Sequence, residues 1–304
     1  MKRMKWLLSA GLTMLLLVPA MTLAEEERGV GDVVYVPTPQ IVVDEMLRMA
    51  KTGPKDFIID LGSGDGRMVI TAAKKFGARG FGVDLSDSLL KESNKSAVDQ
   101  GVSDRANFIK QNLFETDLNQ ATLISTYLLP EMNQRLRPKI LNLRPGTRVV
   151  AHDYHMGDWL PDEQKTLAVP EKIVGTPGVS YIFMWIVPAK VAGRWQSQIA
   201  AGGQSANWDF DFRQTFQMVE GTINSGGRST KLPEFKVEGD QIDFTVLTRS
   251  GDTSTRHQFK GTVNGDTIVG TVVVGTGAAQ KLPWSAKLIK RGDLKSFQSM
   301  AAPQ

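Results

Sequence analysis

One segment decides the fold that this sequence predicts: Ile58-Ile59-Asp60-Leu61-Gly62-Ser63-Gly64-Asp65-Gly66-Arg67. An apolar strand runs into a loop that has glycine at every second position, and a helical pattern follows over residues 67–76. Glycine lets the backbone take positive φ and lets a ligand lie against the main chain without a Cβ atom in the way. The nicotinamide dinucleotide fingerprint G-x-G-x-x-G is excluded, because Arg67 occupies its third glycine position.

Two carboxylates flank this loop. The spacing D-x-G-x-G-x-G, which begins at Asp60, matches the loop that cradles the amino-acid end of S-adenosylmethionine (SAM), and an acid there suits a cationic amino group. Asp84 ends the next predicted strand, where a carboxylate can accept hydrogen bonds from ribose hydroxyls. The alternative for Asp84 is a helix N-cap. We therefore predict SAM as the cofactor.

Residues 28–190 alternate strand-like apolar runs with helical patterns, which favours a parallel α/β sheet. The expected strands are 57–61, 80–84, 107–110, 121–127 and 147–152, followed by a hairpin of 172–175 and 179–187. The expected helices are 41–51, 67–76, 87–100 and 131–141, and any helix within 153–170 must be short. Seven strands in this order predict the Rossmann-like sheet of a class I methyltransferase domain.

Residues 191–290 have a different pattern. Apolar and polar residues alternate, as at Trp208, Phe210 and Phe212, and hairpin signals such as Asn264-Gly265 recur. This pattern predicts a small all-β accessory domain, either a barrel or a sandwich. We expect residues 291–304 to form a flexible tail.

The first 24 residues resemble an export signal. A basic start at residues 2–5 precedes an apolar core at residues 6–18, and small residues at 22–24 suit a cleavage site. We expect a signal peptide over residues 1–24 and a periplasmic or cell-envelope location, with no stable membrane span after cleavage. The alternative is an uncleaved membrane anchor, because the apolar stretch just reaches spanning length.

Composition excludes several classes of function. The net charge is +4, and Lys2, Arg3 and Lys5 of the leader supply three of these charges, so no nucleic-acid partner is expected. The absence of cysteine excludes disulfides, thiolate metal sites and cysteine nucleophiles. Two histidines within residues 152–155 are more typical of a strand end than of a metal site, so we expect no metal.

Further candidates follow the third and fourth predicted strands, at the sheet edge where parallel sheets bind ligands. Asn112 offers a carbonyl to the adenine amino group, although a structural role in its loop is equally compatible. Tyr127 and Glu131 are candidate catalytic residues that handle the nucleophile. The candidate substrate-binding residues are Thr126, Leu129 and Pro130, unless residues 128–130 only pack the loop.

Three stretches point to a narrower group: residues 34–40, the form DLGSGDGR at residues 60–67, and Tyr127-Leu128-Leu129-Pro130. They resemble the family of the mitochondrial ATP synthase c-subunit lysine methyltransferase and its bacterial relatives, over roughly residues 33–160. The resemblance implies methyl transfer to a protein lysine and an upstream segment that closes the cofactor site. Asn112, which stands where the family has an acid, the export signal and the C-terminal β domain are departures from the family pattern.

The sequence thus predicts a SAM-dependent methyltransferase that N-methylates a protein lysine by in-line transfer. The alternatives are a catalytically silent scaffold of the cell envelope and a small-molecule methyltransferase. The expected cofactor-binding residues are Tyr35, Pro37, Thr38, Gln40, Asp60, Gly62, Ser63, Gly64, Gly66, Asp84 and Asn112.

Overall fold

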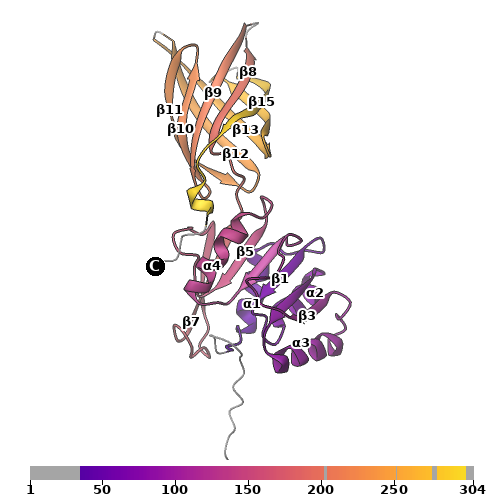
Figure 1. Ribbon diagram of the computed structural model, residues 1–304. Helices are drawn as coiled ribbons and strands as arrows, with labels where there is room; N and C mark the ends of the chain where they lie inside the picture. Colours follow the sequence, from indigo (N-terminus) through magenta and orange to yellow (C-terminus); the bar gives the residue numbers. More distant parts are fainter. Residues whose placement is uncertain (1–34, 202–203, 251, 276–278, 299–304) are drawn as a thin grey trace, which may run out of the picture.

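The computed structural model describes residues 35–201, 204–250, 252–275 and 279–298. The expected signal peptide lies outside these residues and stays a prediction. Among the described helices, none combines the length and the apolarity that crossing a bilayer requires. The chain forms an α/β part and a β-barrel stacked end to end (Figure 1).

A mixed seven-stranded sheet in the order β3-β2-β1-β4-β5-β7-β6 is the centre of the α/β part. Its strands are β1 (Phe57–Leu61), β2 (Arg79–Asp84), β3 (Ala106–Lys110), β4 (Leu123–Thr126), β5 (Arg148–His152), β6 (Glu163–Ala168) and β7 (Val179–Ile186). Strands β1 to β5 run parallel, and β7 pairs antiparallel with both β5 and β6. The predicted Rossmann-like methyltransferase sheet is therefore confirmed.

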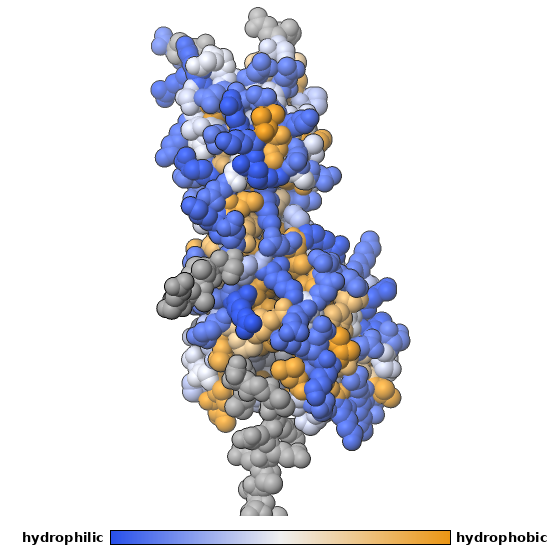
Figure 2. Space-filling view, in the orientation of Figure 1, coloured by the Kyte–Doolittle hydropathy of each residue, from blue (hydrophilic) through white to orange (hydrophobic). Residues whose placement is uncertain are grey.

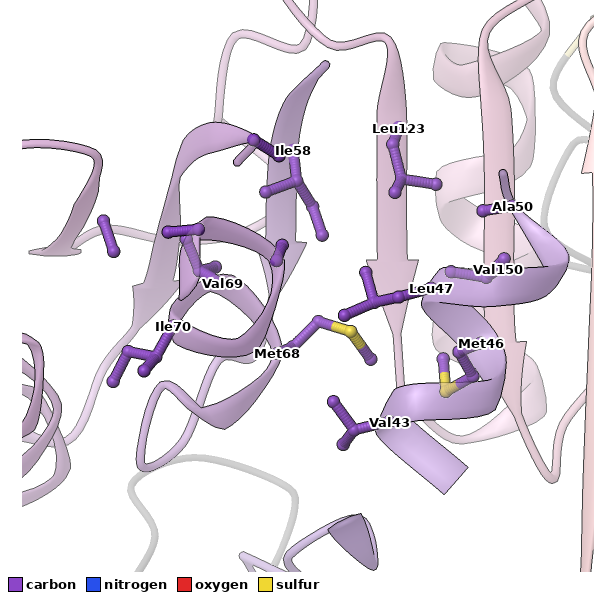
Figure 3. Close-up of a cluster of buried hydrophobic side chains, with 14 of the residues drawn as sticks. Val43, Met46, Leu47, Ala50, Ile58, Met68, Val69, Ile70, Leu123 and Val150 are labelled. Atoms are coloured by element: carbon purple, nitrogen blue, oxygen red, sulfur yellow. The ribbon is translucent and has the colours of Figure 1, made fainter. Parts of the chain in front are cut away.

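Helices cover both faces of this sheet. They are α1 (Gln40–Met49), α2 (Arg67–Phe76), α3 (Asp87–Asp99) and α4 (Pro130–Leu141). Successive strand residues face opposite sides, so Ile58 packs with α1, α2 and α3, whereas Ile59 packs with α4. Figure 3 shows the first of these clusters, in which Leu47 and Val69 approach Ile58 from two helices. This packing fixes the loop that joins β1 to α2.

The sixth strand lies elsewhere than the sequence predicts. The expected position is residues 172–175, but β6 is formed by Glu163–Ala168, and residues 169–178 connect it to β7. Most residues of β6 are exposed, so the strand lacks the apolar pattern that marks a buried strand. Backbone pairing with β7, rather than side-chain burial, makes this segment a strand.

The C-terminal domain is a closed barrel of eight strands, which resolves the choice between barrel and sandwich. The strands are β8 (Gly193–Ala201), β9 (Gln204–Thr215), β10 (Met218–Ser225), β11 (Arg228–Glu238), β12 (Gln241–Ser250), β13 (Thr253–Asn264), β14 (Thr267–Val274) and β15 (Gln280–Arg291). Aromatic rings such as Phe210, Phe244 and Phe259 pack inside, with ring centroids 5.0–6.1 Å apart. The visible outer face is mostly hydrophilic, as the alternation of side chains requires (Figure 2).

Specific contacts join the barrel to the α/β part. The Trp159 indole N–H donates to Gln217 Oε1 at 3.0 Å, and Gln217 Nε2 donates to the Leu160 carbonyl at 2.8 Å. The chain after β15 also returns to this junction, where Phe297 is 2% exposed. One buried aromatic ring thus holds residues 292–298 against the junction, and the expected flexibility of the tail stays a prediction.

Gln217→Ala leaves the buried indole N–H of Trp159 without a partner and also removes the hydrogen bond to the Leu160 carbonyl. Each unpaired buried group costs about 1–3 kcal/mol, so we expect the free energy of unfolding to fall measurably in urea denaturation. The exposed Gln241→Ala is the matched control, with a change of at most about 0.5 kcal/mol. Equal effects of the two substitutions would contradict a specific junction.

Candidate functional site

A cavity of about 320 Å³ lies at the carboxyl ends of β1, β2 and β4. This volume is within the range of small-molecule sites, and the crevice outside the carboxyl ends of the strands is where open α/β sheets bind ligands. Its wall combines the loop after β1, the segment before α1 and the residues that follow β2, β3 and β4. The cavity therefore gathers most of the residues that the sequence analysis selected.

The loop after β1 requires its glycines. Gly62, Gly64 and Gly66 have φ of 78°, 51° and 82°, in the left-handed region that other residues rarely adopt. A Cβ atom at Gly64 would lie only 2.2 Å from Cε2 of Tyr35. The bare backbone at Gly64 thus allows an aromatic ring to cover the loop.

Two carboxylates at this loop have different surroundings. Asp60 is buried and accepts a hydrogen bond from Ser125 Oγ at 2.7 Å. Burial raises the pKa of Asp60 to about 7, and the neighbouring Asp84 adds to this effect. Asp84 instead accepts backbone N–H groups of Gly64 and Ser86, both at 2.9 Å, so it fixes the loop as well as lining the cavity.

Unpaired hydroxyls indicate that the cavity is built for a polar ligand. Ser63 Oγ and Thr126 Oγ1 line the cavity, are buried, and have no hydrogen-bond partner among the described residues. Buried polar atoms are costly unless they are hydrogen-bonded. Together with the carboxylates of Asp60 and Asp84, these hydroxyls fit a ligand with a cationic amino acid and a ribose, as SAM has. The residues present therefore fit the predicted cofactor.

The segment before α1 closes over the loop. The hydroxyl of Tyr35 hydrogen-bonds to Asp65, and burial together with this carboxylate raises the pKa of the phenol. Arg67 pairs with Asp65 through Nε at 2.9 Å and donates through Nη1 to the Thr38 carbonyl at 2.7 Å. Pro37 and Thr38 also line the cavity.

Asp65 and Arg67 were missed as site residues by the sequence analysis. The sequence did contain a signal for them, namely two opposite charges two residues apart in the glycine loop. A loop seldom buries such a pair unless the pair binds another segment of the chain.

Two of the expected cofactor residues are otherwise engaged. Gln40 donates to Asp44 and Thr71 and lines a separate surface groove rather than this cavity, so its role in cofactor binding stays a prediction. Its place at the first position of α1 turns it outward. Asn112 lines the cavity, but its Oδ1 accepts the Phe114 N–H at 3.0 Å in a local turn. The structural alternative for Asn112 is thus observed, while adenine recognition stays a prediction.

Thr126 is the last residue of β4 and Tyr127 follows it, and both line the cavity. We call this part of the cavity its acceptor end, because the sequence analysis assigned both residues to the acceptor. The hydroxyl of Tyr127 donates to Asp153 Oδ2 at 3.3 Å, and its ring centroid lies 4.0 Å from that of His152. Burial and the charge of Asp153 raise the pKa of this phenol. Burial also lowers the pKa of His152 to about 4, so the imidazole is neutral.

Glu131 does not reach this site. Helix α4 begins at Pro130, so Glu131 lies exposed on its first turn, and neither residue lines the cavity. Leu129 is 38% exposed and also lies outside the lining. Glu131, Leu129 and Pro130 are therefore not among the residues that line the cavity, and their contact with the acceptor stays a prediction. No group of acidic or histidine side chains placed to hold a metal occurs among the described residues.

Residues 60–163 match a family model described as the ANTKMT methyltransferase domain. The chain is 43% identical over 136 residues to a protein-lysine N-methyltransferase of Saccharolobus islandicus (strain REY15A), a match that covers 44% of this chain and 84% of that protein. It is 31% identical over 131 residues to the ATP synthase c-subunit lysine N-methyltransferase of Xenopus laevis. This second match covers 42% of the chain and only 56% of the relative, so the chain spans about half of that protein.

A solved structure of an RNA methyltransferase from Salinibacter ruber, in complex with S-adenosyl-L-homocysteine, is 43% identical to this chain. The match covers 51% of the chain and 96% of that protein, with a TM-score of 0.46.

Gly64→Ala should abolish SAM binding in titration calorimetry, because the new methyl group displaces Tyr35 from the loop. Gly101→Ala is the matched control: Gly101 also has a positive φ, 69°, but nothing lies within 4 Å of its added Cβ. Both substitutions carry the same left-handed strain of about 1–2 kcal/mol. If Gly64→Ala binds SAM as tightly as the wild type does, this arrangement of the loop is wrong.

Asp60 should make the unfolding free energy depend on pH. Its folded pKa of about 7 lies above the ordinary value of about 3.9, so the folded state keeps a proton that the unfolded chain has lost. This contribution to stability is therefore lost as pH rises through 7. The free energy of unfolding of Asp60→Asn, measured by urea denaturation relative to the wild type, should rise by about 1 kcal/mol or more between pH 5 and pH 8. The exposed Asp104→Asn should show no such trend, and a pH-independent effect of Asp60→Asn would refute the buried carboxyl.

Proposed function

The chain belongs to the ANTKMT methyltransferase family, a group of SAM-dependent enzymes, and we propose that it methylates the side-chain amine of a protein lysine. The relatives named above as protein-lysine N-methyltransferases support this acceptor. The observation that carries the proposal is the position of Tyr127, which places a neutral phenol and an aromatic face at the acceptor end of the cavity.

The residues around the glycine loop would hold SAM. Asp60 would meet its amino group, Asp84 its ribose, and the free hydroxyl of Ser63 would supply a further hydrogen bond. When bound, SAM supplies a methyl group on a positively charged sulfur that is already activated toward a nucleophile. The protein therefore mainly has to align the acceptor and exclude water.

The charge of the wall suits cations. Three carboxylates and two guanidinium groups line the cavity: Asp60, Asp65, Asp84, Arg67 and Arg135. Asp65 pairs with Arg67, and the Arg135 guanidinium lies 3.8 Å from the centroid of the Phe114 ring. Within the described part of the chain, Asp60 and Asp84 therefore have no cation paired with them. Both a sulfonium and a lysine ammonium are attracted to such a wall.

Tyr127 would receive the amine. A phenol oxygen can accept an N–H, and an aromatic face attracts an ammonium group by about 0.5–2 kcal/mol. Since the pKa of Tyr127 is raised, the phenol stays protonated and does not act as a base. Lysine, with an ordinary pKa near 10.4, loses its proton more readily once desolvated. Water at the mouth, and not Glu131, takes that proton in this scheme.

Labelled SAM incubated with a cell-envelope extract tests the acceptor class, since the expected signal peptide would deliver the chain to that compartment. Label on lysine residues of a protein, located by mass spectrometry, supports the proposal. Label on small molecules or on RNA replaces it with another methyltransferase activity. SAM binding without any transfer indicates a silent scaffold instead.

Tyr127→Phe should lower kcat by about tenfold or more, because the phenol oxygen that orients the amine is lost, while SAM affinity measured by calorimetry stays the same. Glu131→Gln should leave kcat within about twofold, since an exposed residue outside the cavity cannot align the amine. A larger loss for Glu131→Gln than for Tyr127→Phe would reverse these two assignments.

A further inference from the structure

We infer that Asp153 is the positioning residue that fixes the Tyr127 phenol at the acceptor end of the cavity, with the buried Lys172 as its counter-charge. This inference rests on the proposed function, because it assigns the support of the residue that would orient the amine. Asp153 does not line the cavity itself and acts only through Tyr127.

Both carboxylate oxygens of Asp153 are engaged. Oδ2 accepts the Tyr127 hydroxyl at 3.3 Å and lies 2.6 Å from the ammonium of Lys172. Oδ1 accepts the backbone N–H of Tyr181 in β7 at 3.0 Å. The side chain is 6% exposed, so β4, β5, β7 and the β6–β7 connection all meet at one carboxylate.

The backbone at Asp153 is adapted to this role. Its φ of 60° is left-handed, a conformation that aspartate and asparagine adopt more readily than other residues with a side chain. The turn directs the carboxylate back over the end of β5, toward Tyr127.

Lys172 makes the buried carboxylate tolerable. Its side chain is 5% exposed, and its ammonium also donates to the carbonyls of Thr176 and Val179. Removing one partner of such a buried pair leaves an uncompensated charge, whereas replacing both partners by neutral groups does not. The connection that carries Lys172 is thereby held against the end of β5, beside the acceptor end of the cavity.

The other titratable groups around Tyr127 are few. The ring of His152, which is neutral, lies tilted against the Tyr127 ring, and the ring of Tyr154 stacks at 6.1 Å. Burial, the charge of Asp153 and, after it, Tyr154 raise the pKa of the phenol. Asp153 is therefore the charged group that acts most strongly on Tyr127.

Steady-state kinetics with labelled SAM and the cell-envelope extract separates positioning from binding. Asp153→Ala should lower kcat on the order of 10- to 100-fold, as expected for a misplaced group, while the KM for SAM is unchanged. Asp153→Asn tolerates the left-handed backbone and keeps an oxygen acceptor. The double variant Asp153→Asn/Lys172→Met contains neither buried charge, so its kcat should be close to that of the wild type and well above that of Asp153→Ala. A changed KM for SAM with unchanged kcat would overturn the inference.

A double-mutant cycle with Tyr127→Phe tests whether Asp153 acts through the phenol. In the Tyr127→Phe background, Asp153→Ala should cause no further loss of kcat. If the loss of kcat in the double variant equals the product of the losses in the two single variants, Asp153 acts by another route and the inference is overturned.

A spectroscopic test needs no acceptor. The chain has four tyrosines, so ¹³Cζ-tyrosine labelling gives few resonances, and Tyr127→Phe assigns the one from Tyr127. Asp153→Asn in the Lys172→Met background should lower the pKa of Tyr127, because a negative neighbour disfavours the phenolate. An unchanged titration would overturn the positioning role even if the enzyme methylates lysine, and a shifted titration would support it even if the acceptor is not a protein.

Discussion

The site depends on the contact between Tyr35 and the bare backbone of Gly64. Three glycines with left-handed φ let the chain turn from β1 into α2 within a few residues, and the absence of a Cβ atom lets an aromatic ring lie on that turn. Asp84 holds the same loop from the second strand by accepting the Gly64 N–H. Asp65 then hydrogen-bonds to the Tyr35 hydroxyl, and Arg67 binds both Asp65 and the Thr38 carbonyl. The missing Cβ atom at Gly64 therefore lets the glycine loop, the end of β2 and the segment before α1 pack together.

Two buried carboxylates of this protein, Asp60 and Asp153, have different electrostatic surroundings. Asp60 has no cation beside it among the described residues, and its pKa is raised to about 7, so it is poised to become fully charged when a cationic ligand arrives. Asp153 is paired with the buried Lys172 and serves a fixed geometry instead. The difference in environment, rather than in residue type, separates a ligand-responsive carboxylate from a positioning one.

The barrel is attached through a small number of directed contacts. Gln217 bridges the indole of Trp159 and the Leu160 carbonyl, and Phe297 closes the junction from the C-terminal side. Trp159 lies on the stretch of chain that follows β5, so this stretch leads from the end of β5 to the junction. The barrel interior is filled by closely packed aliphatic and aromatic side chains.

Local patterns in the sequence predicted most of the sheet, the glycine loop and the two carboxylates beside it, because strand alternation and glycine spacing are local properties. It also indicated a β-rich second domain, since alternation and hairpin signals are local too. It misplaced β6, which is polar and held by backbone pairing, and it assigned Gln40 and Glu131 to the site, although neither lines the cavity. Which side chains converge follows from the tertiary structure alone. Asp153 pairs with Lys172, which lies 19 positions away, and Arg67 donates a hydrogen bond to the Thr38 carbonyl, 29 positions away. Such contacts follow from the packing of strands and helices, and no local pattern in the chain encodes them.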